Sequence, residues 1–514
     1  MKRTIVIGSR GSDLALWQAN HIKDMLSNIG ISSDIKIIKT KGDYIQHLSF
    51  DKIEGKGFFT KEIENELLDK KVDLAVHSLK DLETDQPNGL MIAAVPDRED
   101  PADCLLIKSS SYSTSSFLNL SPNSIVGTSS SRRKNQLLFF REDLEIKDLR
   151  GNVPTRVEKL KNGDYDAIVL AKAGLNRLNV DLSKIKIYDL DPKIFIPAPG
   201  QGALALQIRS EDEELRMKLQ IINKQNIADN VFFERSILNG IGGGCHSPFG
   251  AYSIEDSNGV RTTWLTYSEK TEQIPYRTVI KGEDYHQLVC QIKKKKSPKK
   301  IFISRDLNGD SVFKKLMLNQ KLPLTACSLI EKEKMEVLEL PDCDWIFFNS
   351  SFAYDSISHL NSFIQNKKLA AIGLGTARYL KSKGLFLEFV GDGTPNNVAQ
   401  KFRACVMGDQ VVFFPSSSRS VGTVEKELSN KNKIVAKTYQ TNLKGLHFSS
   451  HDILVFTSPS NVKAYFDFNS YNGEEVISIG TTTTSCLNDL GIIKIHESIN
   501  SSELSLADTV LSLI

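Results

Sequence analysis

The segment VDLAVHSLKD at residues 72–81 has the composition of a buried strand that ends in a cluster of ionisable side chains. Polar residues at the end of such a strand lie where open α/β sheets bind their ligands. Asp81 can act there as a general acid, or it can stabilise a positive charge that develops on a substrate. A simple loop ion pair between Lys80 and Asp81 is the alternative, and this segment alone does not separate the two interpretations.

Hydroxyl groups and cations follow another strand in the segment IVGTSSSRRK at residues 125–134. The hydroxyl residues fall where a helix should begin, and free backbone N–H groups at a helix start attract anions. Arg132 and Arg133 add planar donors that suit carboxylates. Two adjacent arginines do not share one helix face beyond the first turn, so at least one of them could be purely solvated.

More arginines lie in similar loops. Arg150 and Arg156 flank the turn in RGNVPTR, and Arg10 follows the first apolar stretch. Cations grouped in strand-to-helix loops indicate a polyanionic ligand, although arginine is also common on protein surfaces.

Cys245 lies in the glycine-rich segment NGIGGGCHSPFG at residues 239–250. Buried cysteines are usually inert core residues. A cysteine on a glycine-rich loop is more often accessible and reactive, so local context leaves both interpretations open.

Strand-like and helix-like patterns alternate through the first part of the chain, which predicts an α/β fold with helices covering a sheet. The expected strands are residues 4–8, 34–40, 72–76, 124–127 and 167–170, and the expected helices are residues 13–29 and 61–68.

The C-terminal part contains an internal repeat. Residues 344–351 resemble residues 452–459, and each copy reads as a buried strand that ends in small hydroxylated residues. An Ile-Gly pair follows at Ile372 and again at Ile479, and a further glycine comes eleven residues after each pair. The repeat predicts two similar α/β units, with the cleft between them as the expected ligand site. The segment IGLGTA after Ile372 lacks a third glycine, so a tight turn is preferred to a dinucleotide loop.

Length, net charge and cysteine content narrow the class of protein to which this chain can belong. A chain of 514 residues should form three or more domains, and a net charge of +3 creates no strong global field. Seven cysteines without a CxxC motif predict reduced thiols and a cytoplasmic protein, and no metal site is expected. No signal peptide or membrane span is expected. The run KKKKSPKK at residues 293–300 is interpreted as a solvated linker rather than a nucleic-acid patch.

Residues 1 to about 295 resemble the porphobilinogen deaminase (hydroxymethylbilane synthase) family. The resemblance rests on RGSDLALWQ at 10–18, KG at 56–57, HSLKD at 77–81, GTSSSRR at 127–133, RGNVPTR at 150–156, PAPGQGA at 197–203 and GGCHSP at 243–248. It implies two periplasmic-binding-protein-like lobes and a small α/β domain that carries the cysteine.

The resemblance also implies roles for individual residues. Cys245 matches the cysteine that holds a dipyrromethane cofactor through a thioether, and Asp81 matches the catalytic aspartate. The other cofactor-binding positions are Lys80, Ser12, Thr128, Ser129, Ser131, Arg132, Arg133, Arg150, Gly151 and Gln201. The substrate-binding positions are Arg10, Arg150, Arg156, Arg177, Lys52 and Lys56, the last two on a loop over the cleft.

Residues 299–514 are similar to the uroporphyrinogen III synthase family. The similarity rests on FTSPSNV at 456–462, IGTTTT at 479–484, YQT at 439–441 and the internal repeat, although Phe352 and Ala353 depart from the family pattern in the first copy. It implies a catalytic role for Tyr439 and substrate contacts from Thr457, Ser458, Thr481 and Thr482.

Together the resemblances imply a bifunctional enzyme. It would polymerise porphobilinogen into hydroxymethylbilane and cyclise that product to uroporphyrinogen III. The expected state is a monomer that binds neither nucleic acid nor membrane. The alternatives are a non-catalytic binding protein, a nucleic-acid binder, and a chain whose C-terminal half is degenerate or structural.

Domain boundaries follow from the same comparison. The expected deaminase lobes are residues 1–100 with 198–220 returning, and 101–197, followed by a small domain at 221–292 and the linker at 293–300. The expected synthase lobes are residues 335–438, and 301–334 with 439–514.

Overall fold

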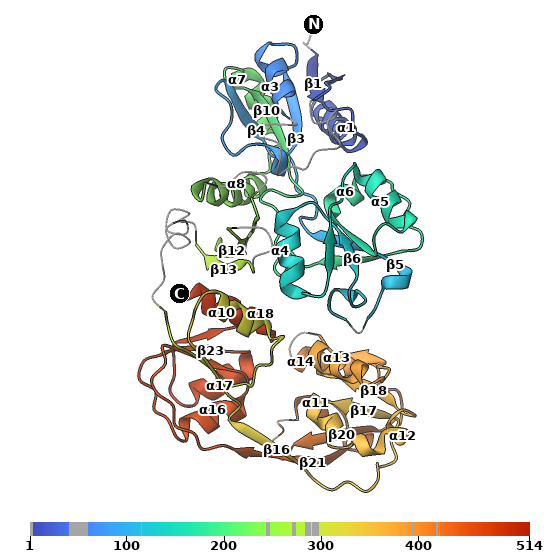
Figure 1. Ribbon diagram of the computed structural model, residues 1–514, viewed down its shortest axis with the longest axis vertical. Coiled ribbons are helices and arrows are strands. Elements are labelled where there is room, and N and C mark those ends of the chain that lie inside the picture. The colour runs from blue at the N-terminus through green and yellow to red at the C-terminus, as the bar shows by residue number, and fades with distance from the viewer. Residues whose placement is uncertain are drawn as a thin grey trace. The chain divides into compact units, whose positions relative to one another are not determined.

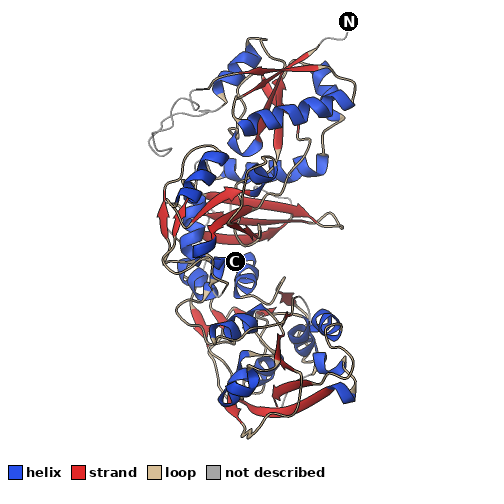
Figure 2. Cartoon of the chain, turned by 90° about the vertical axis from the view of Figure 1, so that its right-hand side faces the viewer, coloured by secondary structure: helices blue, strands red, loops and turns tan. Residues whose placement is uncertain are grey.

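The computed structural model describes residues 4–40, 60–114, 116–242, 247–269, 274–282, 289, 298–392, 395–417, 420 and 422–514. Lys52, Lys56, Cys245 and residues 293–297 of the lysine run lie outside the described residues. The chain divides into two compact units, residues 1–297 with 511–514, and residues 298–510. In both units, helices pack on the faces of sheets (Figures 1 and 2), as an α/β chain requires.

The first sheet of the first unit has the strand order β2-β1-β3-β10-β4. β1 is parallel to β2 and β3, whereas β10 is antiparallel to β3 and β4. The strands are β1 (Ile5–Ser9), β2 (Ser33–Ile37), β3 (Leu74–Ser78), β4 (Leu90–Ala94) and β10 (Leu204–Arg209), and the helices are α1 (Asp13–Asn28), α3 (Lys61–Leu68) and α7 (Glu213–Gln220). Ser12 caps α1 by accepting a hydrogen bond from the Ala15 N–H.

The second sheet has the strand order β7-β6-β8-β5-β9. The central strands β5 and β8 are buried almost throughout, as strands covered on both faces should be. The strands are β5 (Asp103–Lys108), β6 (Ile125–Gly127), β7 (Glu145–Lys147), β8 (Ala167–Ala171) and β9 (Ile185–Leu190), and the helices are α4 (Ser131–Phe140), α5 (Val153–Asn162) and α6 (Lys172–Asn176).

The third part of this unit packs α8 (Gln225–Gly240) on the antiparallel sheet β11 (Phe249–Glu255), β12 (Arg261–Tyr267) and β13 (Tyr276–Lys281). The fully buried Glu234 of α8 joins it to the rest of the unit. Its carboxylate accepts two hydrogen bonds from Arg98, at 2.8 and 3.0 Å, and others from the backbone of Gly200 and Ser253. A buried carboxylate needs such a complete set of donors.

The second unit contains two sheets. One has the order β15-β14-β22-β23-β24 and the other β16-β21-β20-β17-β18-β19. The first comprises β14 (Ile301–Ile303), β15 (Leu324–Ala326), β22 (Ile453–Phe456), β23 (Glu475–Ser478) and β24 (Ile495–Glu497), with α10 (Val312–Asn319), α16 (Pro459–Phe466), α17 (Thr481–Asn488) and α18 (Glu503–Ser512). The second comprises β16 (Ile330–Lys334), β17 (Trp345–Phe348), β18 (Lys368–Ala371), β19 (Phe389–Val390), β20 (Val412–Ser417) and β21 (Lys433–Leu443), with α11 (Ser351–Asp355), α12 (Asn361–Ile364), α13 (Leu374–Ser382), α14 (Pro395–Arg403) and α15 (Thr423–Lys426).

The internal repeat is confirmed. β17 and β22 are each followed by a serine that caps a helix, Ser350 for α11 and Ser458 for α16. The Ile372 and Ile479 N–H groups donate to the last residues of these strands, each at 3.0 Å. Each copy then runs through a helix that ends at a glycine with φ of +80°.

The expected elements are largely present, with shifted ends. The helix at Lys61–Leu68 and the strand starts near residues 4, 124 and 167 agree with the patterns, whereas β2 ends at Ile37 and β3 runs from Leu74 to Ser78. In the second unit, the antiparallel pair of β16 and β21 belongs to the six-stranded sheet, so the expected boundary between residues 438 and 439 falls inside β21.

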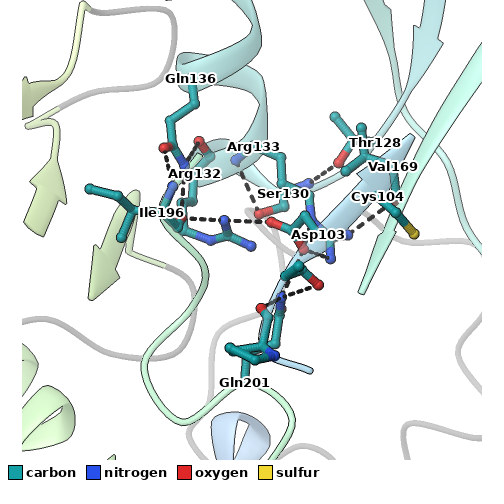
Figure 3. Close-up of polar contacts among 12 residues, drawn as sticks. Asp103, Cys104, Thr128, Ser130, Arg132, Arg133, Gln136, Val169, Ile196 and Gln201 are labelled. Carbon is teal, nitrogen blue, oxygen red and sulfur yellow. Dashed lines mark hydrogen bonds and ion pairs between the residues drawn. The ribbon is translucent and has the colours of Figure 1, made fainter. Parts of the chain in front are cut away.

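A buried carboxylate joins the second sheet to the segment that precedes β10 (Figure 3). Asp103 accepts hydrogen bonds from Arg132 at 2.8 Å, from Arg133 at 2.7 Å and from Gln201 at 2.9 Å. Burial alone would raise the pKa of Asp103, but the two guanidinium groups outweigh it and hold that pKa well below its usual range.

We therefore expect Asp103→Asn to destabilise the first unit by about 3–5 kcal/mol, because the amide leaves two buried guanidinium groups without an anion. Asp143→Asn is the matched control, since Asp143 pairs with Arg141 at a partly exposed position and should contribute less than about 1 kcal/mol. Hydrogen exchange of the β5 and β8 amides, read by mass spectrometry, measures the difference. Equal costs for the two variants would contradict a structural role for Asp103.

Candidate active site

The turn that carries Lys80 and Asp81 lies at the carboxyl end of β3, in the short 3-10 helix Leu79–Asp81. Arg235 of α8 holds it by donating hydrogen bonds to the Leu79 carbonyl at 2.8 Å, the Leu82 carbonyl at 3.1 Å and the Glu83 carbonyl at 2.6 Å. Because α8 leads toward the glycine-rich segment, the helix before Cys245 is packed directly against the turn that presents Asp81.

Lys80 does not form the loop ion pair that was the alternative interpretation. Its Nζ donates instead to Oε1 of Gln201 at 3.3 Å, and Gln201 in turn donates to Asp103. Burial lowers the pKa of Lys80 to about 8, the nearby Asp81 raises it, and Arg133 lowers it further. The exposed Asp81 carboxylate has no hydrogen-bond partner among the described residues, so it is available to a ligand.

Arg156 shows that positive charge exceeds negative charge around Asp81. Its Nε donates to the Gly151 carbonyl at 2.7 Å. Burial lowers the pKa of Arg156 to about 10, and the charges of Arg133 and Arg150 lower it further, with Asp81 opposing them. Arg133, Arg150 and Arg156 therefore gather around the single carboxylate of Asp81, and such a cluster of cations favours an anionic ligand.

The hydroxyls after β6 mainly organise the backbone. Ser129 Oγ both donates to the Leu149 carbonyl and accepts from the Leu149 N–H, while Ser130 caps α4. The Thr128 hydroxyl accepts from the Ser130 N–H at 3.3 Å, and Ser131 begins the helix. The loop therefore fixes the position of the N-terminal end of α4, whose helix dipole favours a nearby anion.

Gly151 occupies a backbone conformation that disfavours other residues. Its φ is +111°, and a Cβ there would lie 2.8 Å from the Thr155 side chain. Only glycine permits the close turn that brings Arg150 and Arg156 to the same edge.

Neither arginine of the pair is purely solvated, so that alternative does not apply. Arg132 and Arg133 are 5% and 7% exposed, because the first turn of α4 lies directly over Asp103. Each of the three guanidinium nitrogens of Arg133 donates to a protein acceptor, Asp103 or the Val169 carbonyl. Its contribution to a ligand is therefore chiefly its charge.

The remaining arginines and Ser12 lie in two places. Arg10 and Ser12 follow β1, at the same sheet edge as Lys80. Arg177 is buried, donates to the Gly202 carbonyl at 2.7 Å and lies over the Trp17 ring at 5.5 Å. Its charged neighbours are Asp97 and Glu99, so it belongs to the junction beside the site.

In the second unit, Tyr439 of β21 is only 5% exposed. Its hydroxyl lies 3.2 Å from Ser350 Oγ, at the carboxyl end of β17. The Phe352 ring packs edge-on against it, with the ring centres 5.1 Å apart, so the departure from the family pattern in the first copy supplies an aromatic neighbour for Tyr439. Burial raises the pKa of Tyr439, and Glu425 raises it further against the effect of Ser350, so the phenol remains a proton donor at neutral pH.

The four hydroxyl residues expected to contact substrate divide into two pairs. Thr457 and Ser458 serve the fold, Thr457 by donating to the Ser304 carbonyl at 2.8 Å and Ser458 by capping α16. Thr481 and Thr482 are exposed at the first turn of α17. Only the second pair leaves its hydroxyls at the surface.

Sequence reasoning missed two residues that organise the first site, Asp103 and Arg235. Asp103 had a signal, since an aspartate opens the strand DCLLIK, which is otherwise apolar until its final lysine and requires a cationic partner. Arg235 had none, because its partners are backbone carbonyls far away in sequence. No group of metal-ligating side chains occurs in the described parts of the chain. No described helix is long and apolar enough to cross a membrane.

Comparison with known proteins gives each half a family. Residues 5–217 match the family model for the porphobilinogen deaminase dipyromethane cofactor binding domain, and residues 323–507 match that for uroporphyrinogen-III synthase HemD. Porphobilinogen deaminase of Maridesulfovibrio salexigens is 48% identical over 51% of this chain and 83% of the relative. That of Nitratiruptor is 43% identical over 55% of this chain and 90% of the relative.

Two solved structures share a low sequence identity with parts of this chain. Uroporphyrinogen-III synthetase of Helicobacter pylori is 19% identical, with a TM-score of 0.33 over 42% of this chain and all of that one. A periplasmic binding protein of Salmonella typhimurium is 12% identical, with a TM-score of 0.27 over 46% of this chain and 97% of that one. The sequence matches, together with the α/β folds of both units, show that the chain belongs to the porphobilinogen deaminase family and continues into a uroporphyrinogen-III synthase region, which makes it a bifunctional enzyme of tetrapyrrole biosynthesis.

Proposed function

We propose that the first unit joins four porphobilinogen molecules into hydroxymethylbilane with release of ammonia, and that the second unit closes this product to uroporphyrinogen III. The observation that carries the first part is the excess of positive charge around Asp81. Each pyrrole ring brings an acetate and a propionate, so a growing chain accumulates negative charge that this cluster can neutralise.

The donor set fits a dipyrromethane cofactor, which also carries several carboxylates. Lys80, Arg132 and Arg150 would hold it, with Arg133 and the N-terminal end of α4 adding positive charge, and we propose a thioether to Cys245. When bound, this cofactor supplies the primer to which substrate rings are added. Holding it covalently makes each addition effectively intramolecular.

Asp81 has the position that the reaction requires of a carboxylate. Loss of ammonia from porphobilinogen leaves an electron-poor ring with positive charge on nitrogen. A carboxylate fixed by the Arg235-braced turn can stabilise that charge and accept or return the pyrrole proton.

In the second unit, Tyr439 is proposed to assist departure of the substrate hydroxyl. The phenol donates a hydrogen bond to the leaving oxygen, and Ser350 holds it in place from the helix cap. The C–O bond breaks, water leaves, and the ring closure that follows releases a proton. The exposed Thr481 and Thr482, together with backbone N–H groups at the start of α17, are proposed to hold substrate carboxylates.

We also propose a cytoplasmic monomer that binds neither nucleic acid nor membrane. Among the described cysteines, Cys104, Cys327, Cys343, Cys405 and Cys486 are free thiols, which suits a reducing compartment. The domain boundaries at residues 100, 197, 220, 292 and 300 remain our proposal for the chain.

The charge of Lys80 should make primer acquisition pH-dependent. With a pKa of about 8, Lys80 loses its proton as the pH rises, so the rate at which primer-free protein takes up its primer should fall above pH 8. Lys80→Arg should keep the rate at higher pH. Because unfolded lysine titrates near 10.5, the free energy of unfolding should rise between about pH 8 and 10.5, and Lys80→Met should lack that slope. Identical pH profiles for the wild-type and Met proteins would exclude this role.

Two substitutions separate anchoring from catalysis. Cys245→Ser should lack the primer mass, because a hydroxyl is a poor nucleophile near neutral pH. Asp81→Asn should keep that mass but form bilane about a hundredfold more slowly, since the amide loses the charge and the proton acceptor. Intact mass and bilane formation measure these effects. Asp85→Asn, at a nearby exposed carboxylate, is the control, and normal turnover of Asp81→Asn would refute the assignment.

The synthase activity is tested in the full chain with Cys245→Ser, supplied with synthetic hydroxymethylbilane and analysed by product isomer. We expect the type III isomer, formed about tenfold more slowly with Tyr439→Phe because one hydrogen bond is lost while the site remains. Tyr354→Phe is the control, as Tyr354 lies in the same core but donates to Asn361. Formation of the type I isomer alone would mean that the C-terminal half is degenerate or structural.

A further inference from the structure

Lys332 lies beside the Tyr439 and Phe352 rings. It is the central residue of β16, opposite Thr441 of β21. Its Nζ is 5.4 Å from the centre of the Phe352 ring and 6.0 Å from that of Tyr439. The two rings meet edge to face, so the ammonium group lies close to both rings and next to the phenol.

The charge of Lys332 is not neutralised by a contact. Burial lowers the pKa of Lys332, Asp355 raises it and Arg305 lowers it again. Asp355 is already engaged, because its Oδ1 accepts the Tyr379 hydroxyl at 2.6 Å. Within the described part of the chain, no carboxylate lies within 4.0 Å of Lys332 Nζ, and the aromatic faces offset its desolvation only in part.

The chemistry of this arrangement is that of an anion site. A partly buried ammonium group, with a second cation nearby and no acid in contact, gains most from a ligand carboxylate. The expected substrate carries two carboxylates on every ring, and Lys332 is the cation whose Nζ lies closest to the Tyr439 ring among the described cation–ring contacts, whereas Ser350 offers a neutral hydroxyl and Glu425 a like charge. A carboxylate bound at Lys332 would place its own ring against the phenol.

We propose that Lys332 binds a ring carboxylate of hydroxymethylbilane and so positions the departing hydroxyl at Tyr439. The inference rests on the proposed synthase function and adds to it a residue that sets substrate affinity and orientation. The binding step makes and breaks no covalent bond.

The test uses the full chain with Cys245→Ser and synthetic hydroxymethylbilane. Lys332→Met keeps the aliphatic stem over the rings and removes the charge, so KM should rise about tenfold or more while kcat changes less. Lys332→Arg keeps the charge and should restore most of the affinity. Lys381→Met is the control, at an exposed lysine in the last turn of α13.

The dependence of KM on ionic strength distinguishes a binding role of Lys332 from a structural one. KM of the parent protein should rise with ionic strength, and Lys332→Met should show a shallower dependence. A merely structural lysine would lower the melting temperature without changing this slope. A KM within twofold of the parent in Lys332→Met, with an unchanged slope, would overturn the proposal.

The affinities of the parent and Lys332→Met proteins for uroporphyrin III distinguish failure of this inference from failure of the proposed function. Type I product from the parent protein would refute the synthase assignment. In that case the affinity for uroporphyrin III alone would test Lys332. Tenfold weaker binding by Lys332→Met would support a carboxylate site, and equal binding would refute it. If the Met protein is unfolded, Lys332→Gln replaces it in both measurements.

Discussion

Burial of the Asp103 carboxylate is the constraint on which the first unit depends. A fully buried anion must be matched by cations and donors, and here these come from the first turn of α4 and from Gln201. Gln201 also accepts from Lys80 at the end of β3. One interaction thus fixes the start of α4, the segment before β10 and the lysine beside the proposed catalytic aspartate.

Both halves present positive charge that the protein only partly neutralises. In the first unit, Lys80, Arg150 and Arg156 exceed the nearby acids, and in the second, Lys332 has aromatic neighbours in place of a carboxylate. Positive charge without a nearby acid lowers the free energy of unfolding, and it is retained where an anionic ligand neutralises it. Two unrelated sheets thereby reach the same arrangement for ligands rich in carboxylates.

The elements and the repeat could be predicted from periodicity, because each is a local property of the chain. The ends of the strands could not be predicted in this way, because they depend on the neighbouring strands with which they pair. β2 ends at Ile37 opposite Ser9, where β1 ends, and β3 continues to Ser78 because β10 pairs with it there. The same limit applies to the sites. Arg132 and Arg133 were recognisable as anion binders, but their burial against Asp103 and the bracing of Asp81 by Arg235 depend on contacts between distant segments.

The strand order also has a consequence for synthesis on the ribosome. β3 and β4 of the first sheet both pair with β10, which is synthesised much later. In the second unit, β14 pairs with β22, which lies near the end of the chain. At roughly 5–20 residues per second, these apolar strands keep an unpaired edge for many seconds after they emerge. An exposed edge is where strands of another chain can pair. The nascent protein should therefore depend on chaperones mainly while it awaits these two late strands.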